Sequence, residues 1–228
     1  MTLKKWTELP DFMRTQEVRE YYDIVKKKQG SMLVKRIFDV VVSAIMVIIV
    51  SPIMLIIAVM IQCDSRGPVF FRQERITQYG RVFRIYKFRT MVNHAERLGT
   101  QVTVEGDMRI TRVGKLLRKA RFDEIPQLFN ILTGDMTFVG TRPEVKKYVD
   151  AYTNEMYATL LVPAGLTSKA SIKYKDEDKL LEGSKDVDVT YIKEVLPQKM
   201  YYNLESIREF GLLSDIITMV STVVAVLR

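Results

Sequence analysis

The sequence predicts an α+β protein that is mainly helical and is held at a membrane by a helix near its N-terminus. Three observations predict this: a nearly continuous apolar run over residues 40–61, strand-like segments on both sides of a turn over 78–80, and helical periodicity through most of the remainder. The 228 residues suffice for one packed domain with an extension. We expect a charged N-terminal extension over 1–34, a membrane helix over 35–64, and a domain with interfacial amphipathic helices over 65–228.

Composition narrows the class of protein. Apolar residues make up 47% and charged residues 27% of the chain, which excludes a disordered polymer and a collagen-like chain. The single cysteine, Cys63, cannot form an internal disulfide, so a reducing setting fits. The formal net charge of +8 suits an anionic partner, such as a membrane surface, a phosphate-bearing substrate or a nucleic acid. We expect no nucleic-acid partner, because the sequence has a membrane run and no DNA- or RNA-binding signature.

The apolar run is long enough to cross a bilayer. At about 1.5 Å per residue, a helix over residues 40–61 is roughly 33 Å long. Pro52 lies near its middle, where a proline removes one helical hydrogen bond and predicts a bend. Ser51 can satisfy part of the freed backbone. The bend would leave two arms, over 40–50 and 53–61, each about one leaflet long.

Basic residues lie on both sides of this run. Lys35 and Arg36 precede it, and Arg66 and Arg72 follow it. The positive-inside rule places both ends on the cytoplasmic side. A helix hairpin that enters and leaves on one face satisfies this rule, whereas a straight span does not. Because proline-kinked spanning helices are also common, the residues alone leave a re-entrant and a spanning helix both open.

The chain after the run alternates between predicted strands and helices. Strands are predicted over 69–73, 82–90 and 136–140, and helices over 92–98, 113–120, 126–132 and 144–161. Gly134 is the expected stop of the third of these helices. Over 212–227, apolar residues share one helical face and polar residues the other, which fits a core helix or a helix in the membrane interface. The extension over 1–34 fits an interfacial helix or a loose arm.

An acidic pair, Asp123 and Glu124, stands just before a helix that is expected to begin at Pro126. Proline suits the first position of a helix, and the residue before it, Ile125, is expected to be non-helical. The positive end of a helix stabilises carboxylates and also binds phosphates. With Arg118 nearby, an ionised aspartate could attack phosphorus, and adjacent carboxylates could hold Mg²⁺. The alternative is that both are ordinary charges at a helix N-terminus.

Other basic residues add positive charge that could bind phosphates. Arg142 precedes Pro143, which holds it extended, as suits either a phosphate fork or a surface arginine. Lys87 and Arg89 lie on the second predicted strand. The one histidine, His94, is expected to be structural, although a Ser-His-Asp or Cys-His mechanism would have to use it.

Several longer motifs follow one another in a fixed order. They are KRIFD at 35–39, SP at 51–52, GPVFFRQER at 67–75, KFRTM at 87–91, DEIPQL at 123–128, GDM at 134–136 and VGTRP at 139–143. In these motifs the chain resembles the bacterial sugar transferases, namely the monotopic polyprenyl-phosphate phosphoglycosyl transferases of the small catalytic-domain type. Thr141 stands where this family commonly has proline, and residues 163–170 match the family only loosely, so the sugar donor stays open.

The resemblance implies an enzyme of membrane glycan assembly. It implies transfer of sugar-1-phosphate from a UDP-sugar to undecaprenyl phosphate with release of UMP, which initiates capsule, exopolysaccharide or glycoconjugate assembly. Asp123 matches the family nucleophile, which carries a covalent phosphosugar, and Glu124 matches the second acid, which is associated with Mg²⁺. Both are expected metal ligands. The expected phosphate-binding residues are all basic: Arg118, Arg142, Lys87 and Arg89.

The resemblance also implies an arrangement at the membrane. Ser51 and Pro52 match the break that makes the membrane helix of this family re-entrant. We therefore expect a monotopic protein on the cytoplasmic face of the bacterial inner membrane, with a catalytic domain over 65–228 in the cytosol. The expected partners are a UDP-sugar, undecaprenyl phosphate and membrane lipids, followed by a second copy in a homodimer and downstream glycosyltransferases. No nucleic acid is expected among them.

Overall fold

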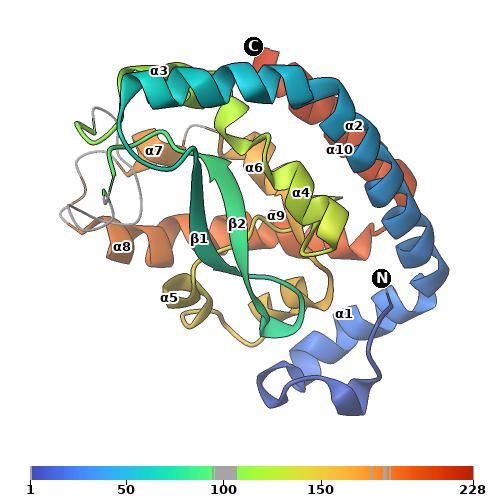
Figure 1. Ribbon diagram of the computed structural model, residues 1–228. Helices are drawn as coiled ribbons and strands as arrows, with labels where there is room; N and C mark the ends of the chain where they lie inside the picture. The colour runs from blue at the N-terminus through green and yellow to red at the C-terminus, as the bar shows by residue number, and fades with distance from the viewer. Residues whose placement is uncertain are drawn as a thin grey trace.

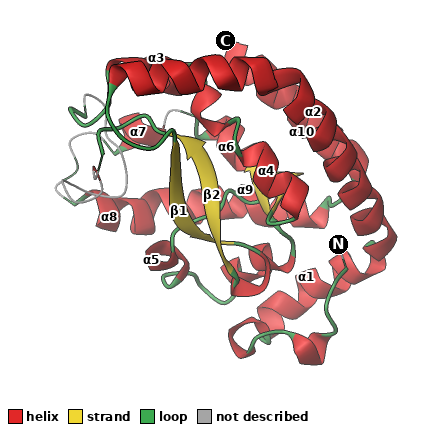
Figure 2. Cartoon of the chain, in the orientation of Figure 1, coloured by secondary structure: helices red, strands yellow, loops and turns green. Residues whose placement is uncertain are grey.

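A computed structural model of the chain describes residues 2–93, 95, 107–175, 177–181, 184 and 186–227. Within these residues helices predominate and the strands form two small sheets, so the mainly helical α+β class is confirmed. The longest helix, α2 (Gln29–Asp64), rises along one side of the molecule and then crosses its top (Figure 1). Figure 2 shows the hairpin of β1 (Phe70–Ile76) and β2 (Val82–Phe88) in the space below this arch.

The bend in α2 occurs inside one continuous helix that contains Pro52. The bend expected at Pro52 is present, but the helix is not interrupted at Ser51 and Pro52, so the expected break is wrong. One proline removes a single hydrogen bond, and the turns on both sides keep theirs. The carbonyl that Pro52 leaves without a donor is that of Ile48, and Ser51 Oγ donates to it at 2.9 Å. The helix also begins at Gln29 rather than at 35. Within the described part of the chain, α2 is the one helix long and apolar enough to cross a membrane.

The first half of α2 has its polar residues on the inside. Lys35, Asp39 and Ser43 are buried. The exposed side chains of the helix are large and apolar, and include Leu33, Val34, Ile37, Val41, Ile45, Ile48, Ile49, Ile53, Leu55, Ile56 and Val59. This distribution reverses that of a helix in a water-soluble protein, whose apolar stripe faces the core.

The C-terminal helix α10 (Leu212–Leu227) has the same reversed pattern. Asp215 and Thr218 are buried against the protein. Most of the exposed side chains are apolar, namely Leu213, Ile216, Ile217, Val220, Val223, Val224 and Val226. A core helix would bury that apolar face, so the core-helix alternative is wrong and an apolar surface on α10 remains open to a membrane.

The N-terminal residues are part of the main hydrophobic core. Two short 3₁₀ turns (Trp6–Glu8 and Asp11–Met13) lead into α1 (Gln16–Lys27), whose first turn is capped by the Thr15 hydroxyl. The buried side chains of α1 pack in one cluster with those of α9 (Leu196–Arg208). Residues 2–27 are therefore neither a loose arm nor an isolated interfacial helix, because their apolar side chains are enclosed by the rest of the chain.

Both sheets have two strands. β1 and β2 are antiparallel, with Phe70 opposite Phe88, and they confirm the predicted hairpin, although β2 ends two residues before the expected Thr90. β3 (Met136–Val139) pairs in parallel with β4 (Ala164–Thr167). At the end of β3 the chain turns back over β4. Gly140 N donates to Thr167 O at 3.0 Å within the parallel register, whereas the carbonyl of Thr141 accepts from Gly165 N at 2.8 Å outside that register.

The remaining helices are short. They are α3 (Arg112–Lys119), α4 (Gln127–Thr133), α5 (Lys146–Val149), α6 (Lys169–Lys173), α7 (Glu177–Leu180) and α8 (Val187–Thr190), with a 3₁₀ helix over Met156–Leu161 and a π-helical turn over Tyr191–Val195. α4 ends at Gly134, which has a φ of 90°, as expected from its missing Cβ. The helix expected over 92–98, with His94, falls mostly outside the described residues.

The long helix expected over 144–161 is wrong. Only α5 and the 3₁₀ helix form there. Glu144 is extended, because its carbonyl accepts a hydrogen bond from Ile76 N at 2.9 Å. Thr153 then interrupts the helix with a turn, in which its hydroxyl accepts from Met156 N at 3.5 Å. Threonine favours such local bonds over the interior of a helix.

Candidate active site

Asp123 and Glu124 lie on a 3₁₀ turn (Phe122–Glu124) between α3 and α4. The turn starts at Arg121, whose φ of 56° reverses the chain, and it continues into α4 through a hydrogen bond from Ile125 N to Phe122 O at 3.3 Å. Ile125 itself has helical angles, so the expectation of a non-helical residue there is wrong. The cost of a helical residue before proline is offset here because the turn runs without interruption into the helix.

Glu124 is held by two cations. Arg142 donates to both of its oxygens, to Oε2 at 3.3 Å and to Oε1 in a shorter contact, and Lys87 Nζ donates to Oε1 at 2.9 Å. Burial alone would raise the pKa of Glu124, but Arg142 and Lys87 outweigh it and hold that pKa well below its usual range. Glu124 is therefore a fixed negative charge that keeps two cations beside Asp123.

Asp123 has the opposite electrostatic balance. Its carboxylate is buried, and no hydrogen bond to it is found among the described residues. Burial and the neighbouring charge of Glu124 raise its pKa, against the opposing influence of Lys87, Arg118 and Arg142. Asp123 thus keeps its oxygen lone pairs available, in a setting where a cation or an electrophile would stabilise its charge.

Each cation reaches the turn from a different element. Arg142 follows β3, after the chain has turned back at Gly140 so that the carbonyl of Thr141 accepts from Gly165 N of β4. Lys87 is the penultimate residue of β2. The Asn130 side chain fixes β2 against α4, since it accepts from Tyr86 N and donates to Arg84 O, both at 2.9 Å.

Arg118 and Arg89 differ in their relation to the acidic pair. Arg118 is in the last turn of α3, and it lowers the pKa of Asp123 through its charge. Arg89 instead donates to the backbone oxygens of Ser65 at 2.5 Å and Ile61 at 3.4 Å, and so caps the C-terminal end of α2. The structure therefore brings together Asp123, Glu124, Lys87, Arg118 and Arg142, and places Arg89 elsewhere.

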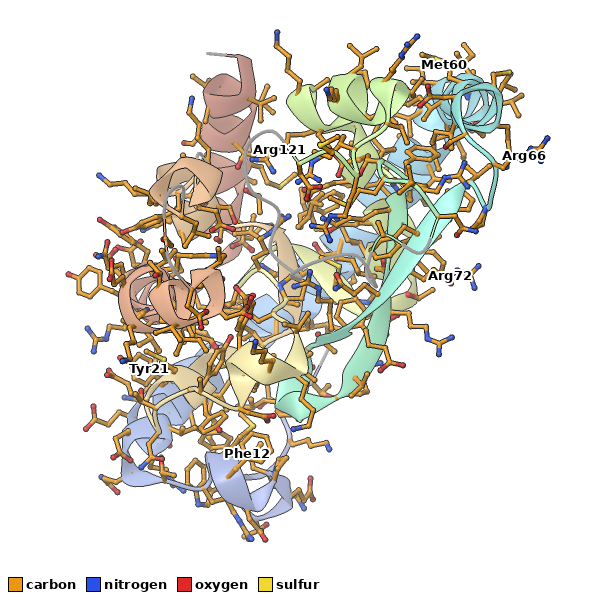
Figure 3. All side chains as sticks on the ribbon, turned by 90° about the vertical axis from the view of Figure 1, so that its left-hand side faces the viewer. Phe12, Tyr21, Met60, Arg66, Arg72 and Arg121 are labelled. Atoms are coloured by element: carbon orange, nitrogen blue, oxygen red, sulfur yellow. The ribbon has the colours of Figure 1, made fainter. Side chains whose placement is uncertain are left out.

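Figure 3 shows Arg66 and Arg72, the basic residues that follow the apolar run, pointing outward along one edge of the molecule. Arg121 lies away from that edge, nearer the C-terminal helix. The Arg121 guanidinium donates to Lys175 O at 3.0 Å. Arg121 thereby ties the start of the acidic turn to the segment after α6.

The apolar helices are bound directly to the strand that leads to Arg142. Lys35 Nζ donates to Val139 O at 2.6 Å and forms a short ion pair with Asp215 of α10. Asp39 accepts from Thr137 Oγ1 at 2.7 Å. The sequence predicted no contact for Lys35, which it showed only as part of the motif at 35–39, and it put Asp215 on the polar face of the helix over 212–227. Their pairing could not be found from spacing, because 180 residues separate them.

Asp123 and Glu124 are the residues that could hold a divalent cation. Among the described residues no group of three or more His, Cys, Asp or Glu side chains gathers in one place. A cation at this turn would therefore take its remaining ligands from water and from phosphate oxygens. Mg²⁺ commonly binds in this way, through one or two carboxylates, so this donor set is compatible with Mg²⁺.

Comparison with known proteins adds to this geometry. A family model described as bacterial sugar transferase matches residues 30–228. The chain is 39% identical over 198 residues to the UDP-N-acetylgalactosamine-undecaprenyl-phosphate N-acetylgalactosaminephosphotransferase of Aeromonas hydrophila, a match that covers 85% of this chain and 44% of the relative.

Two more relatives are similar. The chain is 33% identical over 189 residues to the UDP-glucose:undecaprenyl-phosphate glucose-1-phosphate transferase of Escherichia coli, covering 81% of this chain and 38% of the relative. It is 30% identical over 216 residues to the undecaprenyl-phosphate galactose phosphotransferase of Salmonella typhimurium, covering 88% and 42%. The chain thus spans less than half the length of these three relatives.

Proposed function

Since this chain belongs to the bacterial sugar transferase family, we propose that it transfers sugar-1-phosphate from a UDP-sugar to undecaprenyl phosphate and releases UMP. The observation that carries the proposal is the acidic turn, where a buried aspartate without a hydrogen bond from the described residues adjoins a glutamate that holds Arg142 and Lys87. Both substrates are phosphates, and an anionic nucleophile can approach them only where cations offset the charge. The three relatives are named for N-acetylgalactosamine, glucose and galactose, so the proposed donor is a UDP-linked hexose or N-acetylhexosamine.

The proposed reaction has two displacements at one phosphorus atom. A carboxylate oxygen of Asp123 attacks the β-phosphorus of the UDP-sugar, the bond from that phosphorus to the bridging oxygen breaks, and UMP leaves with the bridging oxygen. The sugar phosphate is then joined to Asp123. A phosphate oxygen of undecaprenyl phosphate attacks the same phosphorus, the Asp123 carboxylate leaves, and the product is a polyprenyl-diphosphate sugar.

The neighbouring residues have separate roles in this proposal. Arg142 and Lys87 offset the charge that builds up on the phosphoryl oxygens, and Glu124 orients both cations. Arg118 adds a further positive charge near Asp123. Mg²⁺ would be held by Asp123 and Glu124, and when bound it would supply positive charge next to the phosphates.

We place this reaction at the cytoplasmic face of the bacterial inner membrane, with α2 re-entrant and the protein monotopic. The support is the outward apolar surface of α2 and α10, the inward polar residues of both helices and the bend at Pro52. The acceptor phosphate lies at that surface, so a site bound to both helices would be held at the height of the acceptor. Initiation of capsule, exopolysaccharide or glycoconjugate assembly, a homodimer and downstream glycosyltransferases stay predictions.

The test is UMP release from a panel of UDP-sugars with undecaprenyl phosphate and Mg²⁺. We expect turnover with at least one donor, and loss of at least about a thousandfold in kcat for Asp123→Asn, because the amide cannot act as the nucleophile. A matched control is Asp11→Asn, an exposed carboxylate next to Phe12 at the far end of the molecule (Figure 3). Wild-type turnover in Asp123→Asn would exclude the nucleophile, and no turnover with any donor would favour a non-catalytic scaffold.

A further inference from the structure

A second buried cluster of charged residues lies beside the acidic turn. Tyr191 OH donates to Glu144 Oε1 at 2.6 Å, and Lys199 Nζ donates to Tyr191 OH at 2.8 Å. Lys199 Nζ also reaches Glu144 Oε1 at 3.4 Å and Glu177 Oε2 at 2.9 Å. Glu144, Tyr191 and Lys199 are 6%, 2% and 4% exposed.

Burying charged side chains of this kind in a protein core is energetically unfavourable. Leu196 and Met200, on the same helix as Lys199, are buried in the main hydrophobic cluster, together with Tyr191. A buried ion pair is often no more stable than apolar residues of similar size, because both charges lose their hydration. A lysine and a glutamate at such positions are therefore poorly explained by stability alone.

The cluster is joined to Arg142 through the backbone of the residues that follow Arg142. Arg75 Nη1 donates to Pro143 O at 3.2 Å, and its guanidinium is 4.0 Å from the Glu144 carboxylate. Ile76 N donates to the carbonyl of Glu144 at 2.9 Å. On the other side of Arg142, the carbonyl of Thr141 accepts from Gly165 N. Residues 141–144 thus form a strap that is fixed at both ends, with Arg142 between the two attachments.

The end of the strap at Glu144 is held by elements that are distant in sequence. Tyr191 belongs to the π-helical turn, and Lys199 to α9, which passes behind the β1–β2 hairpin in Figure 1. The π-helical turn ends at Val195, two residues before Pro197, which has no N–H for the normal helical bond. Such turns are frequent at functional sites. Tyr191, which binds Glu144, is the first residue of this turn.

We propose that Glu144 and Lys199, joined by Tyr191, are positioning residues that hold Arg142 in its orientation toward Glu124 and the reacting phosphate. This inference rests on the proposed transferase function. Neither residue touches the acidic pair in the structure, and each acts through the strap. Through its bond to Glu177, Lys199 also ties the start of α7 to the strap, so that α7 and the strap are held by one side chain.

The variants Glu144→Gln and Lys199→Met test this inference. Gln can still accept the bond from Tyr191, and Met has a similar length to Lys without its charge. We expect each to lower kcat and kcat/KM for the UDP-sugar by about 10- to 100-fold while KM changes by less than about threefold, because an interaction made in the transition state is lost. The control is Asp150→Asn, which breaks the ion pair of Asp150 with Lys146 on the exposed surface.

The double variant Glu144→Gln/Lys199→Met separates positioning from stability. Each single change leaves the remaining buried charge with one partner fewer and should lower the unfolding temperature, whereas the double change removes both charges and should restore part of it. A positioning role requires that kcat stays low in the double variant. If kcat recovers together with the unfolding temperature, the role is structural and the proposal is wrong.

Further outcomes also decide the question. If Glu144→Gln does not fold, Tyr191→Phe removes the central hydroxyl at nearly constant volume, and it should lower kcat by at least about fivefold with KM unchanged. Variants that all keep the wild-type kcat overturn the positioning role but leave the transferase function intact. A wild-type protein without turnover on any UDP-sugar overturns the transferase function, and the positioning role with it.

Discussion

At the scale of single residues, neighbouring carboxylates differ because their partners differ. Glu144 is buried and Glu124 partly so, yet cations hold the pKa of each below its ordinary value, against the effect of burial. For Glu144 the stabilising cations are first Lys199 and then Arg75. Asp123 has no hydrogen-bonded cation among the described residues, and its pKa is raised, chiefly by burial. Environments that move adjacent acids in opposite directions are typical of sites where each acid has its own task.

The lowered pKa of Glu144 predicts an acid-sensitive fold. Because the folded pKa is below the unfolded value of about 4.3, the ionised form stabilises the native state above pH about 4.3, and this stabilisation is lost as the pH falls through the folded pKa. We expect the unfolding temperature of the wild type in detergent to fall as the pH is lowered from about 6 to 3. In Glu144→Gln the fall should be smaller by a few degrees, at about 2–4 °C per kcal/mol. Parallel curves for the two proteins would show that Glu144 has no such linkage.

At the scale of elements, the strap owes its position to two facing glycines. A Cβ on Gly165 would lie 2.1 Å from Gly140 N, so only glycine lets β4 approach the start of the strap this closely. The carbonyl of Thr141, the residue before Arg142, can therefore accept a hydrogen bond from Gly165 N. Any side chain at this crossing would move Arg142 relative to Glu124.

Gly165→Ala should consequently damage both stability and activity. We expect a loss of about 1–3 kcal/mol in the free energy of unfolding, as for overpacking in general, together with a lower kcat. The control is Gly30→Ala in α2, where nothing lies within 4 Å of the new Cβ and stability should be unchanged or slightly higher. Calorimetry and UMP release measure the two effects. An unchanged unfolding temperature in Gly165→Ala would contradict the close approach.

Local patterns in the sequence predicted the elements whose signals are short-range. The hairpin of β1 and β2, the stop at Gly134 and the serine bond at the bend in α2 follow from turn residues, glycine geometry and the proline at 52. The helix over 144–161 was overestimated, because the carbonyl of Glu144 pairs with Ile76, a tertiary contact that periodicity does not contain.

The sequence located Asp123 and Glu124, but it did not reveal the residues that hold the site in position. Arg89 looked like a phosphate ligand by charge, and only the fold reveals that it caps α2. Lys199 and Glu144 are 55 residues apart, and nothing in their local sequence marks them as partners. For α10, periodicity identified two faces, but which of them lies against the protein depends on Lys35, far away in the chain.

At the scale of the whole molecule, two helices present one kind of surface. α2 and α10 both expose apolar side chains and bury polar ones, and Lys35 joins them. In water such a surface would be a liability, whereas in lipid it is the stable arrangement. The acidic turn and its charges thus lie within the domain, whereas the exposed apolar side chains lie on α2 and α10.

A re-entrant α2 predicts that both of its ends are accessible from one side of the membrane. Cys63 is exposed near the C-terminal end of the helix, and Lys27→Cys in a Cys63→Ser background reports on the other end. We expect a membrane-impermeant maleimide to label both positions in inverted inner-membrane vesicles and neither in spheroplasts, since both flanks are basic. Permeabilised cells serve as the control for reactivity. Labelling of the two ends from opposite sides would establish a spanning helix.

The ion pair between Lys35 and Asp215 has a consequence for how the protein is made. Ribosomes synthesise α2 well before α10, so 180 further residues must be added after Lys35 before Asp215 is present to pair with it. Until then the nascent helix carries an ammonium group that lipid would penalise heavily, unless it stays near the headgroups. With α2 in the membrane, as proposed above, we expect insertion to full depth only after α10 has been synthesised and Asp215 can pair with Lys35.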